Sequence, residues 1–143
     1  MKNEPIVIER KLNATVDEVW KAITDPVVMK NWYFDLPGFK AEVGYEFSFT
    51  GGKDENNQYL HLCKITEAVK NKKLSYSWRY DGYEGSSLVT FELTPDGNST
   101  LLKLTHEGLH TFPANPDFAK ENFVQGWTEI TKALQEFLSK QSV

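Results

Sequence analysis

The longest hydrophobic pattern in the chain lies near its C-terminal end. From Asp117 to about Lys140 there is no proline. Large apolar side chains recur within this segment at alternating steps of four and three residues, at Phe123, Trp127, Ile130, Leu134 and Phe137. This spacing places all five side chains on one stripe of a single helix. A helix of this size is about 34 Å long, which is enough to cross a whole sheet.

The first 32 residues predict one strand followed by two short helices. Ile6–Leu12 is rich in β-branched residues and predicts a strand. The spacing of Thr15–Glu18 is that of a capping box, which predicts a helix of two to three turns. A second helix is expected from Pro26 to about Trp32, with Asp25 as its N-terminal cap.

The middle of the chain alternates apolar and polar residues with a period of two, which predicts short strands. The expected strands are residues 39–43, 45–49, 58–67, 74–80, 87–94 and 100–107. Residues 51–57, 81–85 and 108–116 are expected to be loops, and Pro95–Asn98 is a strong turn signal. Asn115 or Asp117 is then the expected cap of the last helix.

This order predicts one α+β domain over residues 1–143. A curved antiparallel sheet of about six to seven strands packs against the long C-terminal helix and encloses a space between them. Gly126 falls inside that helix, where glycine costs about 1 kcal/mol relative to alanine. We therefore expect Gly126 either to allow a close approach of helix and sheet or to leave room for a ligand.

Composition narrows the classes of function. The 143 residues carry a net charge of −4 with a pI of about 5.4, so the basic footprint of a nucleic-acid-binding protein is missing. No basic cluster suggests an anionic membrane surface. The single cysteine, Cys63, cannot form an internal disulfide, which suits a reducing compartment. With no signal-peptide pattern and no apolar run of membrane-spanning length, a cytoplasmic protein is expected.

The order of motifs resembles the START-like (SRPBCC) helix-grip superfamily. Within it, the chain is similar to the domain found in activators of the heat-shock-protein-90 ATPase (AHSA1-like). The resemblance covers nearly the whole chain and rests on Val19–Pro26 with Trp32, Val43–Phe47, Leu74–Trp78, Val89–Leu93, Leu102–Leu109 and Gly126–Trp127. It implies a helix-grip fold, but it implies no single function, because members include lipid-transfer proteins, polyketide cyclases and stress proteins.

Two departures from the family pattern matter. Cys63 stands where relatives carry glycine, so it is expected either to fill part of a pocket or to remove a bulge. The additional N-terminal domain of eukaryotic co-chaperones is not in these 143 residues, so direct chaperone activation is not expected.

Seven aromatic side chains are candidates for lining an apolar pocket. They are Trp32, Phe47, Phe49, Tyr76, Trp78, Phe91 and Trp127. Residues of one parity on a strand share a face, so Phe47 points with Phe49 and Tyr76 points with Trp78. Hydrophobic core is the ordinary interpretation of each ring alone. The set as a whole suggests a lined cavity, because tryptophan and tyrosine carry polar tips that need partners when buried.

His106 is the eighth candidate, since its parity points it inward at the end of its strand. It can bind a ligand or act as an acid or base, although a histidine hydrogen-bonded within the core is the simpler interpretation. Glu46, Glu92 and Glu107 have outward parity, so no inward carboxylate accompanies it; only Asp35 and Arg79 are candidates near a rim. His61 and His110 lack metal-ligand spacing, and neither a metal nor a cofactor is expected.

The sequence therefore favours binding of a small, mostly apolar or aromatic molecule between sheet and helix. One alternative is a stress-related protein-interaction module, for which an exposed apolar patch would be the sign. Another is a cyclase- or hydrolase-like enzyme that uses His106. The expected partners are a small hydrophobic molecule and, in the module hypothesis, a protein, with no nucleic acid or membrane, and the chain is expected to be a monomer or homodimer.

Overall fold

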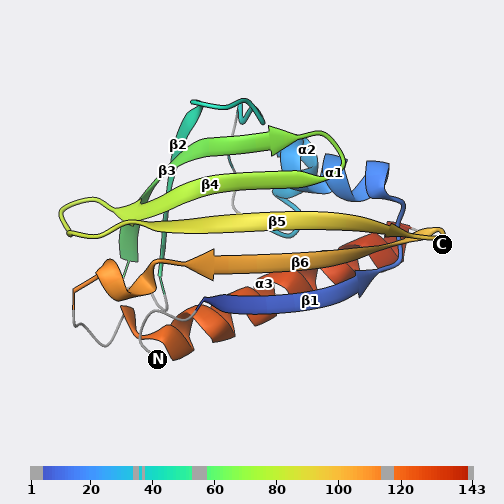
Figure 1. Ribbon diagram of the computed structural model, residues 1–143. Coiled ribbons are helices and arrows are strands. Elements are labelled where there is room, and N and C mark those ends of the chain that lie inside the picture. Colours follow the sequence, from blue (N-terminus) through green and yellow to red (C-terminus); the bar gives the residue numbers. More distant parts are fainter. Residues whose placement is uncertain (1–4, 34–35, 37, 53–57, 114–117, 142–143) are drawn as a thin grey trace.

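The structure is a computed structural model that describes residues 5–33, 36, 38–52, 58–113 and 118–141. Six strands in this part of the chain form one antiparallel sheet in the order β1-β6-β5-β4-β3-β2 (Figure 1). The strands are β1 Ile6–Leu12, β2 Glu46–Gly52, β3 Gln58–Val69, β4 Lys73–Tyr80, β5 Ser87–Asp96 and β6 Ser99–Glu107. The helices are α1 Val16–Thr24, α2 Pro26–Met29, the short 3-10 helix η1 Leu109–Thr111, and α3 Lys120–Gln141. The predicted α+β helix-grip architecture is confirmed.

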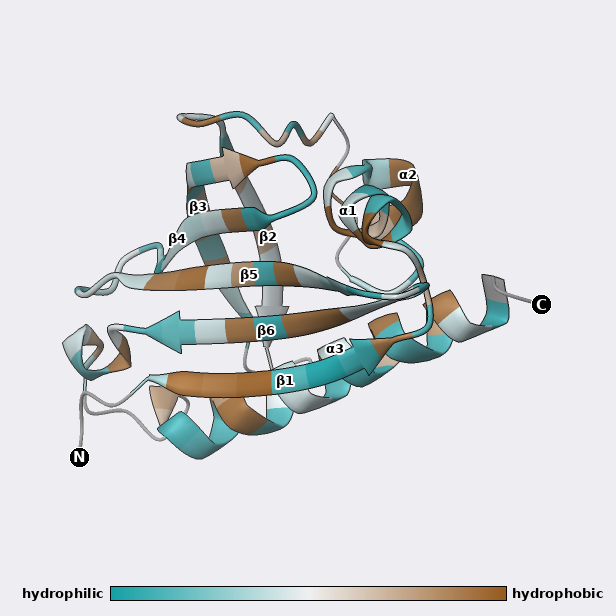
Figure 2. Ribbon diagram, turned by 45° about the vertical axis from the view of Figure 1, so that its right-hand side comes forward, coloured by the Kyte–Doolittle hydropathy of each residue, from teal (hydrophilic) through white to brown (hydrophobic). Residues whose placement is uncertain are grey.

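All the helices that cover the sheet lie on one of its faces. Figures 1 and 2 show α3 running across the sheet on the same side as α1 and α2. The strands turn alternate residues toward this inner face, where Ile65, Leu74, Phe91 and Leu104 are almost fully buried. The core therefore lies in one layer between the sheet and the three helices.

Helix α1 begins as the sequence predicts. The Glu18 amide donates to the Thr15 hydroxyl over 3.3 Å, and the Glu18 carboxylate accepts from the Thr15 amide over 2.9 Å. This reciprocal pair satisfies two backbone donors that the first turn leaves free. Asp25 caps α2 in the expected way by accepting from the Val27 amide over 2.9 Å.

An inward-facing arginine joins the first strand to the last helix. Arg10 of β1 donates from Nε to the Thr131 hydroxyl over 2.7 Å and from Nη2 to the Thr128 carbonyl over 2.9 Å. Its Nη1 lies 3.4 Å from Oε1 of Gln135. These bonds connect parts of the chain more than a hundred residues apart, so Arg10 sets how β1 and α3 lie against each other.

Two predicted elements differ from the structure. Residues 39–43 do not form a strand; the segment ends in a turn in which the Tyr45 amide donates to the Glu42 carbonyl over 3.0 Å. Phe39 is buried while Val43 is exposed, so the alternation there does not mark one buried face. The second helix ends at Met29 rather than near Trp32 and continues only as turns.

The last helix is described from Lys120, and both of its predicted caps, Asn115 and Asp117, lie outside the described residues. A Cβ at Gly126 meets nothing within 4 Å in the described part of the chain. The expected close approach of helix and sheet at Gly126 is therefore wrong. That the glycine leaves room for a ligand stays a prediction.

Cys63, whose face the sequence left open, points inward from β3 and is buried. The register of β3 against β4 shifts between Ile65 and Glu67. Cys63 itself pairs in register with Phe47 and Trp78, and that Cys63 removes a bulge stays a prediction, because the shift two residues further along does not test it.

Candidate functional site

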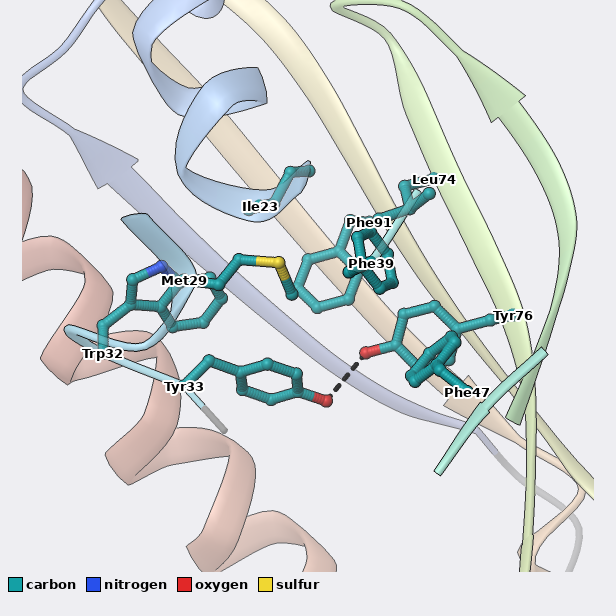
Figure 3. A pocket seen from close by; sticks show the side chains of 9 residues that line it. All are labelled: Ile23, Met29, Trp32, Tyr33, Phe39, Phe47, Leu74, Tyr76 and Phe91. Atoms are coloured by element: carbon teal, nitrogen blue, oxygen red, sulfur yellow. Dashed lines mark hydrogen bonds between the residues drawn. The ribbon is translucent and has the colours of Figure 1, made fainter. Parts of the chain in front are cut away.

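A small apolar cavity lies between α1, α2 and the inner face of the sheet. Its volume is about 10 Å³, and Figure 3 shows the side chains that surround it. They are Ile23, Met29, Trp32, Tyr33, Phe39, Phe47, Leu74, Tyr76 and Phe91. A space of this size holds about one water molecule. The fold therefore encloses a hollow at this place, but aromatic rings fill most of it. None of the nine lining residues belongs to α3, so this cavity lies under the two short helices and not between the sheet and the C-terminal helix, where the sequence placed it.

A pair of tyrosine hydroxyls is the main polar feature beside this cavity. The oxygens of Tyr33 and Tyr76 lie 2.8 Å apart and point toward one another (Figure 3). Burial raises the pKa of both phenols well above the ordinary value, so both stay protonated and neutral at physiological pH. Trp32 supplies the one side-chain nitrogen among the nine lining residues, and its Nε1 donates to the Ala22 carbonyl over 2.8 Å.

Four of the eight site residues predicted from the sequence line this cavity, namely Trp32, Phe47, Tyr76 and Phe91. The other four, Phe49, Trp78, His106 and Trp127, are buried outside its lining.

The side chains of those four residues pack against one another between α3 and the sheet. The ring centroids of Trp78 and Trp127 lie 5.4 Å apart, and those of Phe49 and Trp78 lie 5.6 Å apart. His106 packs edge-on against Trp78 at 5.4 Å. Such spacings are those of rings in direct contact. The predicted inward direction of His106 is confirmed, and so are the shared faces of Phe47 with Phe49 and of Tyr76 with Trp78. The structure divides the eight candidates between a cavity wall and a packed core.

His106 is held by a chain of hydrogen bonds that determines its tautomer. The Trp127 indole N–H donates to Nδ1 over 2.9 Å, and Nε2 lies 2.7 Å from the Ser87 hydroxyl oxygen. The Ser87 hydroxyl in turn lies 2.9 Å from the Trp78 carbonyl, to which it donates. Because an indole N–H can only donate, Nδ1 carries no hydrogen and the ring proton is on Nε2. Burial lowers the pKa of His106 to about 3, so the ring is neutral.

This arrangement does not suit acid–base catalysis. A histidine that activates a serine must accept the hydroxyl proton, but Nε2 of His106 donates to Ser87. The remaining lone pair of the ring, on Nδ1, already accepts the hydrogen bond from the Trp127 indole N–H. His106 is therefore a satisfied core histidine, the simpler of the two interpretations that the sequence allowed.

His61 is a second buried histidine of the inner face. Its Nδ1 lies 3.0 Å from the Tyr59 carbonyl and 3.2 Å from the Phe49 carbonyl, so that nitrogen carries the hydrogen. Burial lowers the pKa of His61 to about 4. No group of three or more histidine, cysteine, aspartate or glutamate side chains in the described residues is arranged to hold a metal ion.

The charged candidates lie away from the cavity. Glu46 and Glu107 are exposed on the outer face of the sheet, as their parity predicts. Arg79 is exposed and lines an outer groove with Lys64 and Ser77, so it does not reach the rim of the inner cavity. Asp35 lies outside the described residues.

Sequence reasoning missed five of the lining residues. They are Ile23, Met29, Tyr33, Phe39 and Leu74. Tyr33 is the most important omission, because it supplies half of the hydroxyl pair. Its position directly after Trp32 was a usable signal, since both follow the short second helix and both are aromatic.

The model of the Activator of Hsp90 ATPase homolog 1-like protein family matches residues 13–139. The chain belongs to this family. No functionally curated protein matches the sequence significantly. The family lies within the START-like helix-grip superfamily, whose members commonly bind small hydrophobic molecules.

Solved structures agree with this assignment. Protein Mll3558 from Rhizobium loti is 25% identical with a TM-score of 0.81, over 95% of this chain and 97% of that one. CalU16 from Micromonospora echinospora is 27% identical with a TM-score of 0.72, over 96% of this chain and 78% of its own. DynU16, a protein in the dynemicin biosynthetic locus, is 20% identical with a TM-score of 0.78, over 96% of this chain and 48% of its own, and shows the fold alone.

No helix in the described part of the chain combines the length and the apolar character needed to cross a membrane.

Proposed function

We propose that this protein binds a small, mostly apolar or aromatic molecule in the cavity between α2 and the sheet. The observation that carries the proposal is the composition of the wall, which combines six aromatic rings and three aliphatic side chains with no charged group. Pockets for small molecules are largely apolar with a few placed polar groups, and this wall follows that pattern.

The cavity has to expand before it holds such a molecule. A dry cavity that binds benzene in another protein measures about 150 Å³, far more than the space here. Met29 supports expansion, because an unbranched side chain with three rotatable bonds adapts to a new neighbour more readily than a ring does. Met29 lines the cavity from α2, a helix of only four residues. Displacement of Met29 is therefore the way of admitting a ligand that costs the least free energy.

Toluene is a suitable probe for this expansion. Methyl-resolved NMR of the protein with added toluene is expected to shift the methyl signals of Ile23, Met29 and Leu74, which line the cavity. The exposed methyls of Val7, on the outer face of β1, are the matched control and are expected to stay unchanged. Native mass spectrometry of protein purified from its own host is expected to show a co-purifying small molecule. Shifts confined to surface methyls, together with protein that carries no ligand, would contradict the proposal.

The two alternatives receive less support from the structure. An enzyme using His106 conflicts with the direction of its hydrogen bonds to Trp127 and Ser87. For the interaction module, the exposed apolar side chains include Val27 of α2, Val43, and Val7, Leu60 and Leu101 on the outer face of the sheet. The last three stand on different strands, and each is paired with a polar residue. Single exposed apolar side chains are ordinary on protein surfaces, so these residues do not by themselves mark a docking surface.

A further inference from the structure

The proposed ligand site contains one feature that selects a chemical class, the hydroxyl pair of Tyr33 and Tyr76. We infer that the ligand is a neutral phenol of about one ring, whose hydroxyl donates to the Tyr76 oxygen. This inference rests on the proposed function and deepens it, because it says which apolar molecules the cavity prefers.

Hydrogen-bond capacity favours a donor on the ligand. A tyrosine hydroxyl donates one hydrogen and accepts up to two. The 2.8 Å bond to Tyr33 uses either the hydrogen of Tyr76 or one of its lone pairs, so Tyr76 keeps at least one acceptor position in both cases. A phenolic O–H placed beside this pair has a partner, whereas an aliphatic or unsubstituted aromatic ligand leaves that position unused.

The electrostatics of the wall exclude charged ligands. None of the nine lining residues carries a charge. A carboxylate entering this space would lose its hydration without gaining a cation, which is strongly unfavourable. Because burial also keeps both tyrosines protonated, a cationic ligand would find no phenolate to pair with. The site therefore discriminates a neutral phenol from an anionic benzoate.

The shape of the wall favours a single flat ring. Phe47 meets both Phe39 and Tyr76 edge to face, with centroids 5.1 Å apart and planes inclined at 76° and 75°. A planar aromatic ligand continues this edge-to-face packing more favourably than an aliphatic chain does. Displacement of Met29 alone makes room for a group of limited size, so the ligand is limited to about one ring.

Three aromatic molecules of one ring each test the inference, namely p-cresol, toluene and 4-methylbenzoate. Affinities are measured by NMR titration of the cavity methyls in the wild type, in Tyr76→Phe and in Tyr83→Phe. Tyr83 is 40% exposed, does not line the cavity and serves as the control. We expect p-cresol to bind about five- to tenfold more tightly than toluene, the factor of one additional hydrogen bond. We expect 4-methylbenzoate not to bind.

In Tyr76→Phe the preference for p-cresol is expected to disappear while toluene affinity stays unchanged, and Tyr83→Phe is expected to keep the wild-type preference. If Tyr76→Phe does not fold, Tyr33→Phe leaves the Tyr76 hydroxyl able to accept and is expected to keep the preference for p-cresol over toluene; loss of the preference in Tyr33→Phe would contradict Tyr76 as the acceptor.

Equal binding of p-cresol and toluene in the wild type, or a preference that survives Tyr76→Phe, would overturn the phenol assignment and leave the cavity as a binding site. Failure of all three molecules to reach the cavity methyls would overturn the proposed function itself.

Discussion

Replacing His106 with glutamine is expected to remove about half of the acid sensitivity of this protein. The chain buries two neutral histidines, whose pKa values are lowered to about 3 at His106 and about 4 at His61. In the unfolded chain both titrate near 6.5. Between those values the unfolded state binds protons that the folded state does not, so stability is lost as the pH falls below about 6.5.

The size of the effect follows from the same values. At pH 5 the unfolded state gains about 2 kcal/mol from protonating each histidine, since pH 5 lies about 1.5 units below 6.5 and each unit is worth 1.36 kcal/mol. The two histidines together therefore remove about 4 kcal/mol between pH 7.5 and pH 5. A domain of this size is typically stable by 5–15 kcal/mol, so the loss is large enough to measure.

Urea denaturation at pH 7.5 and pH 5.0, followed by tryptophan fluorescence, provides the assay. His106→Gln keeps an acceptor for Trp127 and a donor for Ser87 but cannot titrate, so its loss is expected to fall to about 2 kcal/mol. His110→Gln, in exposed η1, is the control and is expected to keep the loss of about 4 kcal/mol. If His106→Gln loses as much stability as the wild type between the two pH values, the assignment of His106 as a buried neutral group is wrong.

Two further predictions concern α3. Gly126→Ala is expected to stabilise the protein by up to about 1 kcal/mol, because a Cβ there meets nothing within 4 Å and alanine is the better helix former. A melting temperature that does not rise would contradict this and would show a clash or a function for the glycine. Arg10→Met keeps the apolar stem but removes the bonds to Thr131 and Thr128, and is expected to cost about 1–2 kcal/mol in urea unfolding. Lys11→Met, which breaks an exposed 3.8 Å ion pair to Asp96, is the control and is expected to change the free energy of unfolding by less than about 0.5 kcal/mol. Equal losses of unfolding free energy in the two variants would refute the stabilising contact of Arg10 with α3.

Much of the fold could be predicted from local sequence, because periodicity and capping act over a few residues. The stripe from Phe123 to Phe137 indicated the long helix, and the Thr15–Glu18 spacing indicated where α1 begins. The alternation in β4 correctly predicted that Tyr76 and Trp78 share a face. The segment 39–43 was mistaken for a strand because its alternation resembles one, although its backbone makes a turn instead of joining the sheet.

The candidate site was predictable only in part. Parity put Phe47 with Phe49 and Tyr76 with Trp78 on shared faces, but parity does not say which inner-face rings touch one another and which border empty space. That depends on contacts between distant segments, such as the turn after α2 that places Tyr33 against Tyr76, 43 residues further along. The same limit applied to His106, whose partners Ser87 and Trp127 lie 19 and 21 residues away.

The sequence by itself determined most of the elements, their order and the face that most strand side chains take, since these follow from local geometry. Only the tertiary structure decided that His106 is neutral and fully engaged, that the inner rings divide into a packed layer and a cavity wall, and that two tyrosine hydroxyls meet in that wall. The physical reason is that packing density and hydrogen-bond pairing are properties of groups brought together by the whole fold. The periodicity of one segment does not determine which other segment will pack against it.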